Sequence, residues 1–290
     1  MNGDQIELRS AQNRATILLK GAEVASWSVS GLETIWKPDP SIWDRSSPIL
    51  FPVVGWCRDA HIRVRDHAYP MGVHGFAAHQ HFRVVEQSNH AVKLLLRDSP
   101  ETRKYYPFAF ELVVSHEIFG SSLCSTLTIR NTGQEVLPFA CGLHPGFRWP
   151  LGGADREGHA IEFSAREEPV VPVIAPGGLF SEATRPVTMK DRRLDMADDL
   201  FAQEALCFLN SRSRSVEYIA PHGVRLRADF VNLPHLALWS KPGAPFICIE
   251  AWTSHGDPVG FDGDIFHKPS MIHLESQAES RHSGTFTLKR

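Results

Sequence analysis

The sequence lacks the long hydrophobic runs that membrane-embedded and exported proteins need. No apolar run approaches the roughly 18 residues of a membrane-spanning helix. The polar, acidic segment from Met1 to Ser10 also lacks the basic start and apolar stretch of a signal peptide. These absences predict a cytoplasmic protein that has no membrane partner.

Cysteine pairs are missing as well. The five cysteines are widely spaced and odd in number, and they include no Cys-x-x-Cys motif that would indicate zinc binding or disulfide exchange. They are Cys57, Cys124, Cys141, Cys207 and Cys248, and most of them lie within apolar segments. We therefore expect reduced, buried thiols, as in a cytosolic protein.

Neither sign of charge predominates. The chain has 30 Lys and Arg against 33 Asp and Glu, which gives a formal net charge of −3. Proteins that bind nucleic acid or anionic membranes use a broad excess of basic residues. We therefore expect no nucleic-acid partner and no membrane partner.

The sequence does contain a large hydrophobic fraction, distributed over short segments. With 290 residues, 42% of them hydrophobic, the chain can bury a large core, and we expect one domain over residues 1–290. Apolar and polar residues alternate in Phe108–Glu117 and Leu123–Arg130, and turn residues separate the two segments. Strands and turns that recur at about 8–12-residue spacing predict an all-β fold, either a sandwich or a barrel.

Other parts of the chain give weaker patterns. We predict one hairpin that joins Glu7–Leu19 to Val24–Val29 and a smaller one over Arg63–Tyr69. Residues 151–200 are rich in Gly, Pro and charged residues. This composition predicts long loops there, with one short helical turn near Asp195–Phe201.

Three polar residues stand out against apolar surroundings. His144 lies between glycines and is followed by Pro145, a pairing that disfavours helix and predicts a strand end or turn. His74 lies in a second glycine-flanked segment, and Glu250 interrupts the apolar strand Phe246–Trp252. Two histidines and a carboxylate suggest acid–base chemistry.

Each of these residues also has a structural interpretation. A lone histidine such as His144 is usually a satisfied structural residue, and His74 could simply cap a turn. An unpaired carboxylate in an apolar strand is costly, so Glu250 should be either functional or paired, for example with Arg58 or Lys241. Glu250 is therefore the strongest single indication of a site.

The remaining histidines are less informative. His79 and His81 would place both rings on one face of a strand, but no third ligand has metal-binding spacing, so no metal site is predicted. The others are interpreted as surface residues, namely His159, His222, His235, His255, His267, His273 and His282.

Six motifs then occur in order along the chain. They are Gly21-Ala22-Glu23, Pro48–Gly55, His74-Gly75-Phe76-Ala77, Tyr106–Phe110, Gly142–Phe147 and Cys248–Trp252. Each motif is weak alone, but the ordered set resembles the aldose 1-epimerase (galactose mutarotase) family, and most closely its LacX-like bacterial branch. The resemblance runs from Ile6 to Leu288. It implies a large antiparallel β-sandwich, the galactose mutarotase-like supersandwich, with an open cleft across one sheet. It also implies an enzyme that interconverts the α and β anomers of a free sugar without a cofactor.

The resemblance also implies roles for the three polar residues. Mutarotation opens a hemiacetal, which requires a base for the anomeric hydroxyl and an acid for the ring oxygen. By resemblance Glu250 is the base, His144 is the acid, and His74 hydrogen-bonds the sugar. Attraction between Glu250 and His144 favours their charged forms, whereas burial favours their neutral forms. The sequence leaves open which effect dominates.

The substrate-binding residues implied by the resemblance include one departure. The LacX-like branch usually has Gly-Arg after the Phe-Pro-Val-Val run, but here Gly55 is followed by Trp56, with Arg58 two positions later. Either Arg58 reaches the sugar hydroxyls, or Trp56 offers a stacking surface for the sugar ring. Trp252 and Glu204, the nearest counterpart of the family's substrate-orienting Asp, complete the predicted set.

Three functions remain open from the sequence. The first is a mutarotase that acts on a free aldose as a monomer or homodimer, which the presence of His74, His144 and Glu250 favours. The second is a hexose-6-phosphate 1-epimerase, which would need two or more converging arginines. Candidates for that grip are Arg58, Arg63, Arg65 and Arg103. The third is a non-catalytic carbohydrate-binding protein on the same fold.

Overall fold

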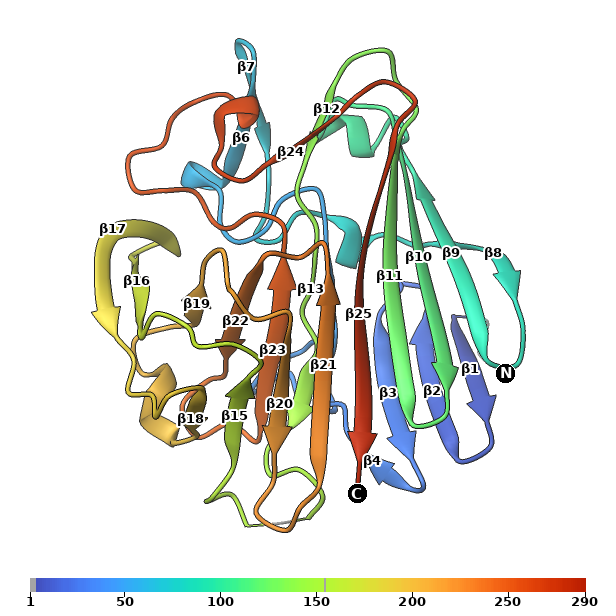
Figure 1. The fold of residues 1–290 in the computed structure, drawn as a ribbon. Helices are drawn as coiled ribbons and strands as arrows, with labels where there is room; N and C mark the ends of the chain where they lie inside the picture. Colours follow the sequence, from blue (N-terminus) through green and yellow to red (C-terminus); the bar gives the residue numbers. More distant parts are fainter. Residues whose placement is uncertain (1–3, 154) are drawn as a thin grey trace.

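The computed structural model describes residues 4–153 and 155–290, and these residues are almost wholly β-structure (Figure 1). They contain no α-helix, only short 3₁₀ turns: η1 (Arg58–Ala60), η2 (Ala77–His79), η3 (Thr102–Lys104), η4 (Asp198–Phe201) and η5 (Ile265–His267). None of these turns is long or apolar enough to cross a membrane. The five cysteines are free thiols, and all except Cys124 are buried.

A nine-stranded antiparallel sheet forms one layer of the molecule (Figure 1). Its strand order is β18 (Arg193–Asp195), β15 (Ala160–Phe163), β20 (Ser215–Ile219), β21 (Arg225–Val231), β25 (Glu279–Lys289), β11 (Ser122–Asn131), β10 (Phe110–Phe119), β9 (Ala91–Arg97) and β8 (Arg83–Gln87). The two strands predicted over Phe108–Glu117 and Leu123–Arg130 are present as β10 and β11, paired from Phe110↔Asn131 to Phe119↔Ser122. Alternate residues of β10 are buried, because successive side chains point to opposite faces of a sheet.

A second sheet packs against this layer and carries the site described below. Its order is β19 (Leu206–Phe208), β22 (His235–Trp239), β23 (Phe246–Trp252), β13 (Gly142–Leu143) and β5 (Ile49–Leu50), with β14 (Gly146–Arg148) also paired to β23. All seven residues of β23 are buried. This central strand therefore has protein on both faces.

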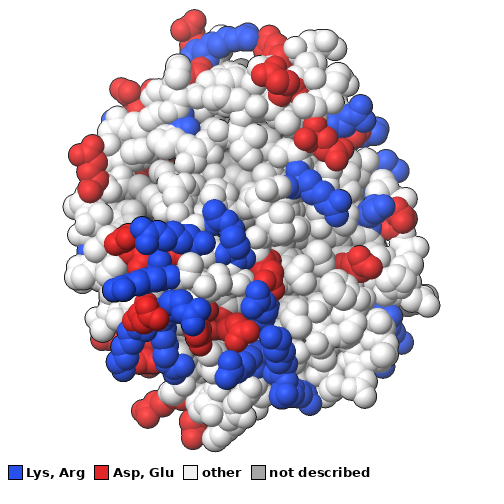
Figure 2. Space-filling model, in the orientation of Figure 1, with Lys and Arg blue, Asp and Glu red and all other residues white. Residues whose placement is uncertain are grey.

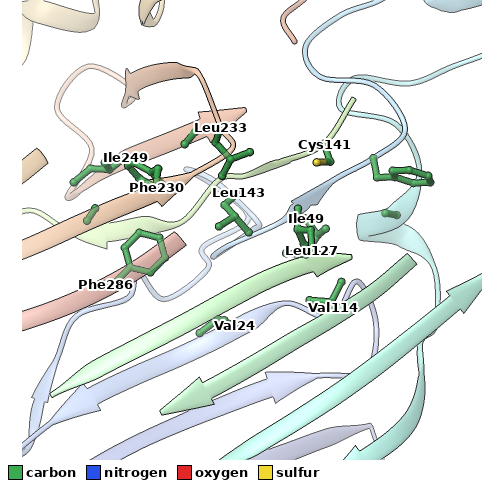
Figure 3. Close-up of a cluster of buried hydrophobic side chains, with 14 of the residues drawn as sticks. Val24, Ile49, Val114, Leu127, Cys141, Leu143, Phe230, Leu233, Ile249 and Phe286 are labelled. Carbon is green, nitrogen blue, oxygen red and sulfur yellow. The ribbon is translucent and has the colours of Figure 1, made fainter. Parts of the chain in front are cut away.

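Side chains from both sheets meet in the main core (Figure 3). Phe230 and Phe286 come from the nine-stranded sheet, and Leu143 and Ile249 come from the second sheet. A Cβ atom added to Gly284 of β25 would lie 2.7 Å from Cδ1 of Leu143, so the two sheets approach closely here. The predicted antiparallel β-sandwich is confirmed.

Smaller sheets extend the sandwich. They are β1 (Gln5–Ser10), β2 (Asn13–Leu18), β3 (Val24–Val29) and β4 (Leu32–Glu33) in one sheet, and the pairs β6 (His61–Val64) with β7 (His67–Pro70), β12 (Leu137–Phe139) with β24 (Ile272–Leu274), and β16 (Val170–Ala175) with β17 (Leu179–Pro186). The hairpin predicted over Arg63–Tyr69 is present as β6 and β7. The predicted first hairpin is present as β2 and β3, but the segment Glu7–Leu19 is two strands, divided by a tight turn at Ala11 with φ of 47°.

The prediction of long loops over residues 151–200 is wrong, since four strands lie there, namely β15, β16, β17 and β18. Pro172 lies inside β16, which pairs only with β17 in a two-stranded sheet and shifts register directly after Pro172. Proline is tolerated at such edge and bulge positions although it lacks a backbone N–H. Much of β17 is exposed, so it lacks the alternation that identifies a strand. The predicted helical turn is present as η4.

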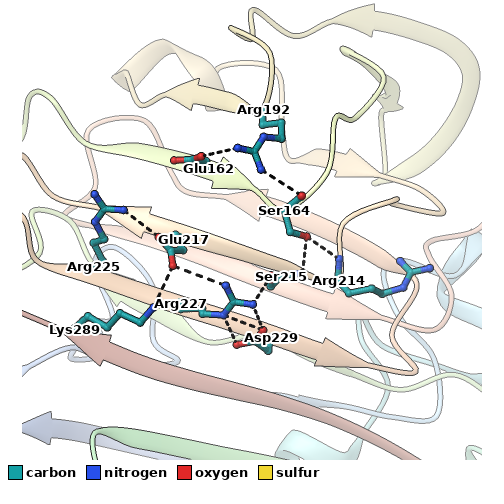
Figure 4. Close-up of polar contacts among 10 residues, drawn as sticks. All are labelled: Glu162, Ser164, Arg192, Arg214, Ser215, Glu217, Arg225, Arg227, Asp229 and Lys289. Atoms are coloured by element: carbon teal, nitrogen blue, oxygen red, sulfur yellow. Dashed lines mark hydrogen bonds and ion pairs between the residues drawn. The ribbon is translucent and has the colours of Figure 1, made fainter.

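The outer face of the nine-stranded sheet carries both signs of charge (Figure 2). Figure 4 shows Glu217 between Arg225 and Lys289, with closest N–O distances of 3.3 and 3.4 Å. Arg227 pairs with Asp229 at 2.6 Å. Exposed pairs of this kind stabilise a fold by about 0–1 kcal/mol each. Positive and negative side chains are therefore intermingled on this face (Figure 2 and Figure 4).

Candidate active site

Glu250 lies on the face of β23 that points away from the main core. Side chains alternate along a strand, so Ile247 and Ile249 enter the main core while Cys248 and Trp252 join other apolar clusters. Glu250 shares the second orientation and is only 3% exposed. Nε1 of Trp252 donates a hydrogen bond to its Oε2 atom at 3.0 Å. Burial raises the pKa of Glu250 to about 8, although this hydrogen bond acts in the opposite direction.

His144 occupies the step between β13 and β14, two short strands that both pair with β23. Leu143 is opposite Ala251, so the next position along each strand places His144 beside Glu250. The Nε2 atom of His144 lies 3.3 Å from Oε1 of Glu250. The sequence predicted that these residues, 106 positions apart, would meet, and the sheet register brings them into contact.

Burial controls the protonation of this pair. It lowers the pKa of His144 well below its ordinary value, and the nearby His74 acts in the same direction. Because burial also raises the pKa of Glu250, burial favours a neutral carboxylic acid facing a neutral imidazole. Moving one proton across the contact would give the carboxylate–imidazolium form. The pair therefore holds one transferable proton in either form, and it titrates as a unit.

His74 completes the group. Its backbone has φ of 62°, and the following Gly75 is required because a Cβ atom there would lie 2.2 Å from the carbonyl oxygen of Phe51. The Nδ1 atom of His74 accepts a hydrogen bond from the Gly55 N–H at 3.1 Å, so its proton is on Nε2. Burial lowers the pKa of His74 to about 4, which keeps the ring neutral. Its ring centroid is 5.3 Å from that of His144.

Two tryptophans that the sequence did not indicate enclose His144. The Trp43 ring lies 5.3 Å from the His144 ring at an interplanar angle of 30°, and the Trp239 ring lies 5.8 Å away at 82°. Both belong to an apolar cluster with Phe246. Trp43 precedes β5 in the chain and Trp239 ends β22, and neither has a spacing that relates it to His144.

One cavity of about 450 Å³ contains the group. Glu250, His144 and His74 line it, and so do three of the predicted substrate-binding residues, Trp56, Glu204 and Trp252. The sequence did not predict Trp43, Arg45, Phe180 and Trp239, which also line the cavity.

The fourth predicted substrate-binding residue, Arg58, is not part of the cavity lining. The chain enters η1 at Arg58, and the side chain lies toward Asp59, with a closest N–O distance of 3.7 Å. The backbone N–H of Arg58 donates to the carboxylate of Asp257 at 2.8 Å. This contact and the turn fix the residue outside the cavity. Of the two alternatives, Arg58 therefore lies outside the cavity lining, and Trp56 belongs to it.

Trp56 instead forms part of the cavity wall. Its side chain is 47% exposed, and a Cβ atom added to Gly178 would lie 1.9 Å from its Cδ1 atom. The turn between β16 and β17 therefore packs directly on the indole ring. Asp257 holds both parts, because its N–H donates to the Trp56 carbonyl at 2.8 Å and its carbonyl accepts from the Phe180 N–H at 2.9 Å.

The surface interpretation of seven histidines is only partly correct. His222, His267 and His273 are exposed. The remaining four are buried, with exposed fractions between 1% and 8%, and their ring nitrogens contact backbone groups: His159, His235, His255 and His282.

His79 and His81 do not act as a pair. His79 ends η2 and bonds to Arg45, whereas His81 lies 3.8 Å from Asp4. Over residues 4–153 and 155–290, no group of three His, Cys, Asp or Glu side chains is arranged to hold a metal ion.

Comparison with known proteins identifies the family. The sequence model of the aldose 1-epimerase family matches residues 4–257. The chain belongs to the aldose 1-epimerase family. This epimerase-family chain is 32% identical to the chromosomal LacX protein of Lactococcus lactis over 269 aligned residues. The alignment covers 89% of this chain and 90% of LacX. The resemblance to the LacX-like branch is thus confirmed.

Solved structures agree with this assignment to the aldose 1-epimerases. A galactose mutarotase-like protein from Lactobacillus casei superposes with a TM-score of 0.92 and 26% identity, over 98% of this chain and 100% of that one. A galactose mutarotase related enzyme from Lactobacillus acidophilus gives a TM-score of 0.90 at 26% identity, over 99% and 97% of the two chains. The fold is therefore that of the galactose mutarotases.

Proposed function

We propose that this chain is an aldose 1-epimerase that interconverts the α and β anomers of an unphosphorylated aldose. The observation that carries the proposal is the buried contact of 3.3 Å between His144 and Glu250 in the cavity wall. Family membership supports an isomerase of this general type. The reaction moves only protons and one ring bond, so its chemistry needs no cofactor.

The chemistry assigns each residue a step. Glu250, as carboxylate, removes the proton from the anomeric hydroxyl, the C1–O5 bond breaks, and the electrons of that bond pass to the ring oxygen. His144, as imidazolium, protonates that oxygen and gives the open-chain aldehyde. Rotation about C1–C2 presents the other face of the carbonyl, and the reverse proton transfers close the ring. His74 donates from Nε2 to a substrate oxygen and stays neutral throughout.

Proximity explains why a neutral His144–Glu250 pair is compatible with this mechanism. The carboxylate–imidazolium form contains the same number of protons as the neutral form and differs by one transfer between Oε1 and Nε2. Substrate hydroxyls that hydrogen-bond to the charged groups stabilise that form. The pair then reaches its reactive carboxylate–imidazolium form without exchanging a proton with solvent.

The hexose-6-phosphate alternative has less support. Neither Arg58 nor the other candidates Arg63, Arg65 and Arg103 belong to the cavity lining. Among the described residues, Arg45 is the one arginine or lysine that lines it. A phosphate grip built from two or more converging arginines is therefore not supported.

The test is a comparison of freshly dissolved α-anomers of glucose, galactose and their 6-phosphates by polarimetry. We expect the protein to accelerate the relaxation of a free sugar above the buffer rate and to act on the phosphates much more slowly. Faster action on a 6-phosphate would favour the hexose-6-phosphate epimerase. Sugar binding without acceleration of any aldose would favour the non-catalytic carbohydrate-binding protein.

A further inference from the structure

Arg45 lines the cavity and takes no part in the proton transfers of the proposed reaction. It lies two residues after Trp43, whose ring is 5.3 Å from that of His144, and it lines the same cavity as the acid–base pair. Its side chain is 21% exposed. Nη1 donates to the carbonyl oxygen of Ala78 at 3.2 Å and lies 3.6 Å from Oε2 of Glu23. These contacts fix the guanidinium in one position at the cavity wall.

Glu23 is itself held rigidly. Its Oε1 atom accepts hydrogen bonds from the backbone N–H groups of Ser46 and Ser47, at 2.6 and 2.9 Å, and from the Ser46 hydroxyl at 2.9 Å. This carboxylate is 3% exposed. A buried carboxylate with three donors on one oxygen provides a fixed anchor for Arg45 through the other oxygen.

His79 extends the same wall. Nη2 of Arg45 lies 2.7 Å from Nδ1 of His79. Arginine can only donate, so Nδ1 must be the acceptor and the proton of the neutral ring is on Nε2. Burial lowers the pKa of His79, and the positive charges of Arg45 and Lys20 act in the same direction while Asp44 and Glu23 oppose them. His79 is therefore a neutral donor with a fixed tautomer.

The donors of Arg45 are not exhausted by these contacts. A guanidinium has five N–H groups, and the hydrogen bonds to Ala78 and His79 use two of them. Asp44 also lines the cavity and supplies a carboxylate acceptor. This part of the wall thus combines donors from Arg45 and His79 with an acceptor from Asp44.

We propose that Arg45, His79 and Asp44 form a subsite that binds adjacent hydroxyl groups of an unphosphorylated aldose. A sugar hydroxyl both donates and accepts, so it matches a wall that contains both kinds of group. A phosphate dianion only accepts, and it would be repelled by Asp44 at a site where Glu23 already offsets the charge of Arg45. The inference rests on the proposed mutarotase function for its kinetic readout, and it gives the hydroxyl-binding role to Arg45, which lines the cavity, in place of Arg58, which does not.

The test uses the full chain and its Arg45→Gln, Arg45→Lys and Asp44→Asn variants, with Arg97→Gln as control. Arg97 pairs with Glu111 at 2.5 Å on the nine-stranded sheet, outside the cavity lining. Two readouts are needed: KM and kcat for mutarotation of glucose and galactose, and the Kd of each sugar from quenching of the tryptophans that line the cavity. Glucose 6-phosphate is measured in parallel.

We expect Arg45→Gln to raise both KM and Kd for the free sugar by about 10- to 100-fold, with a much smaller change in kcat, because a charged hydrogen bond formed throughout the reaction is lost. Arg45→Lys keeps the charge that Glu23 needs but lacks the planar fork, so it should weaken binding to a smaller extent. Asp44→Asn should weaken free-sugar binding and reduce the discrimination against the 6-phosphate. Arg97→Gln should match the wild type.

Unchanged KM and Kd in a folded Arg45→Gln protein would overturn the proposal. Tighter binding of glucose 6-phosphate than of glucose by the wild type, lost selectively in Arg45→Gln, would overturn it in favour of a phosphate subsite. Failure of the mutarotase proposal is distinguishable, because the wild type would then bind sugar without turnover while Arg45→Gln would still weaken Kd.

Discussion

The Nε2 atom of His144 lies 3.3 Å from Oε1 of Glu250, and both side chains are buried, with exposed fractions of 8% and 4%. The Glu250 carboxyl and the His144 imidazole therefore hold one transferable proton between them. The pH dependence and the mutational behaviour of the protein should follow from that sharing.

The first prediction concerns pH. Burial raises the pKa of Glu250 to about 8, so above this pH the pair loses its shared proton and leaves a carboxylate with no protonated partner. We therefore expect kcat/KM to be level on the acid side of pH 8 and to fall about tenfold per unit above it. Polarimetric rates corrected for the buffer reaction measure this profile. A kcat/KM that keeps rising beyond pH 9 would mean that Glu250 acts as a lone base.

A second prediction concerns the coupling of the pair. His144→Gln should lower kcat strongly, but the double variant with Glu250→Gln should be little slower than the worse single variant. Acid and base serve one ring-opening event, so little of the rate acceleration that survives the first substitution depends on the second residue. A product of the two single effects in the double variant would show that the residues act independently. Circular dichroism of all three variants provides the folding control.

Gly178 allows a third prediction about the cavity wall. Gly178→Ala should displace the Trp56 indole, because the new methyl group would lie 1.9 Å from Cδ1, and KM for the sugar should rise severalfold. Gly177→Ala is the matched control, since Gly177 also has positive φ but no atom within 4 Å of an added Cβ. Both variants carry the same backbone strain. Equal KM values in the two would remove Trp56 from the substrate contacts.

The fourth prediction concerns stability and His116. This buried ring donates from Nε2 to the Ala22 carbonyl at 2.8 Å, and in the neutral form its Nδ1 accepts from the Ser125 hydroxyl at 2.9 Å. Its pKa is lowered to about 4 by burial. The folded-state pKa is depressed, so its contribution is fully present above pH 6.5 and is lost as the pH falls toward 4.

This loss corresponds to about 3 kcal/mol of the free energy of unfolding. His116→Gln should be less stable at pH 7 but should show a shallower decline on acidification in urea titrations at several pH values. His222→Gln, at an exposed position, should retain the wild-type decline. An unchanged slope in His116→Gln would mean that His116 is not one of the groups responsible for it.

Several features were predictable because their signals are local. The alternation in β10 and β11 identifies strands, and His144, Glu250 and His74 each stand in an apolar or glycine-flanked segment. Their meeting follows from the sheet register, which no single segment contains, and the sequence pointed to it only through the family resemblance.

Other features depend on contacts that are distant in sequence. Arg45 enters the site through Glu23, 22 residues away, and through His79, 34 residues away, so its own segment contains no signal. His159 is buried, and its Nε2 accepts a hydrogen bond from the Leu151 N–H at 3.1 Å, a contact that polar composition does not reveal. Exposed β17 lacks alternation, and the turn at η1 that removes Arg58 from the cavity depends on Asp257, 199 residues later.

The most direct test of the account is the rate of mutarotation of fresh α-glucose and α-galactose with wild-type protein and with Glu250→Gln. The substitution keeps the volume and the hydrogen bond reach of the side chain but removes the base. The account predicts that the wild type accelerates relaxation of at least one of these sugars and that Glu250→Gln lowers kcat by about 10²–10⁴-fold with little change in Kd. A Glu250→Gln protein that epimerises the same sugar at the wild-type rate would contradict it.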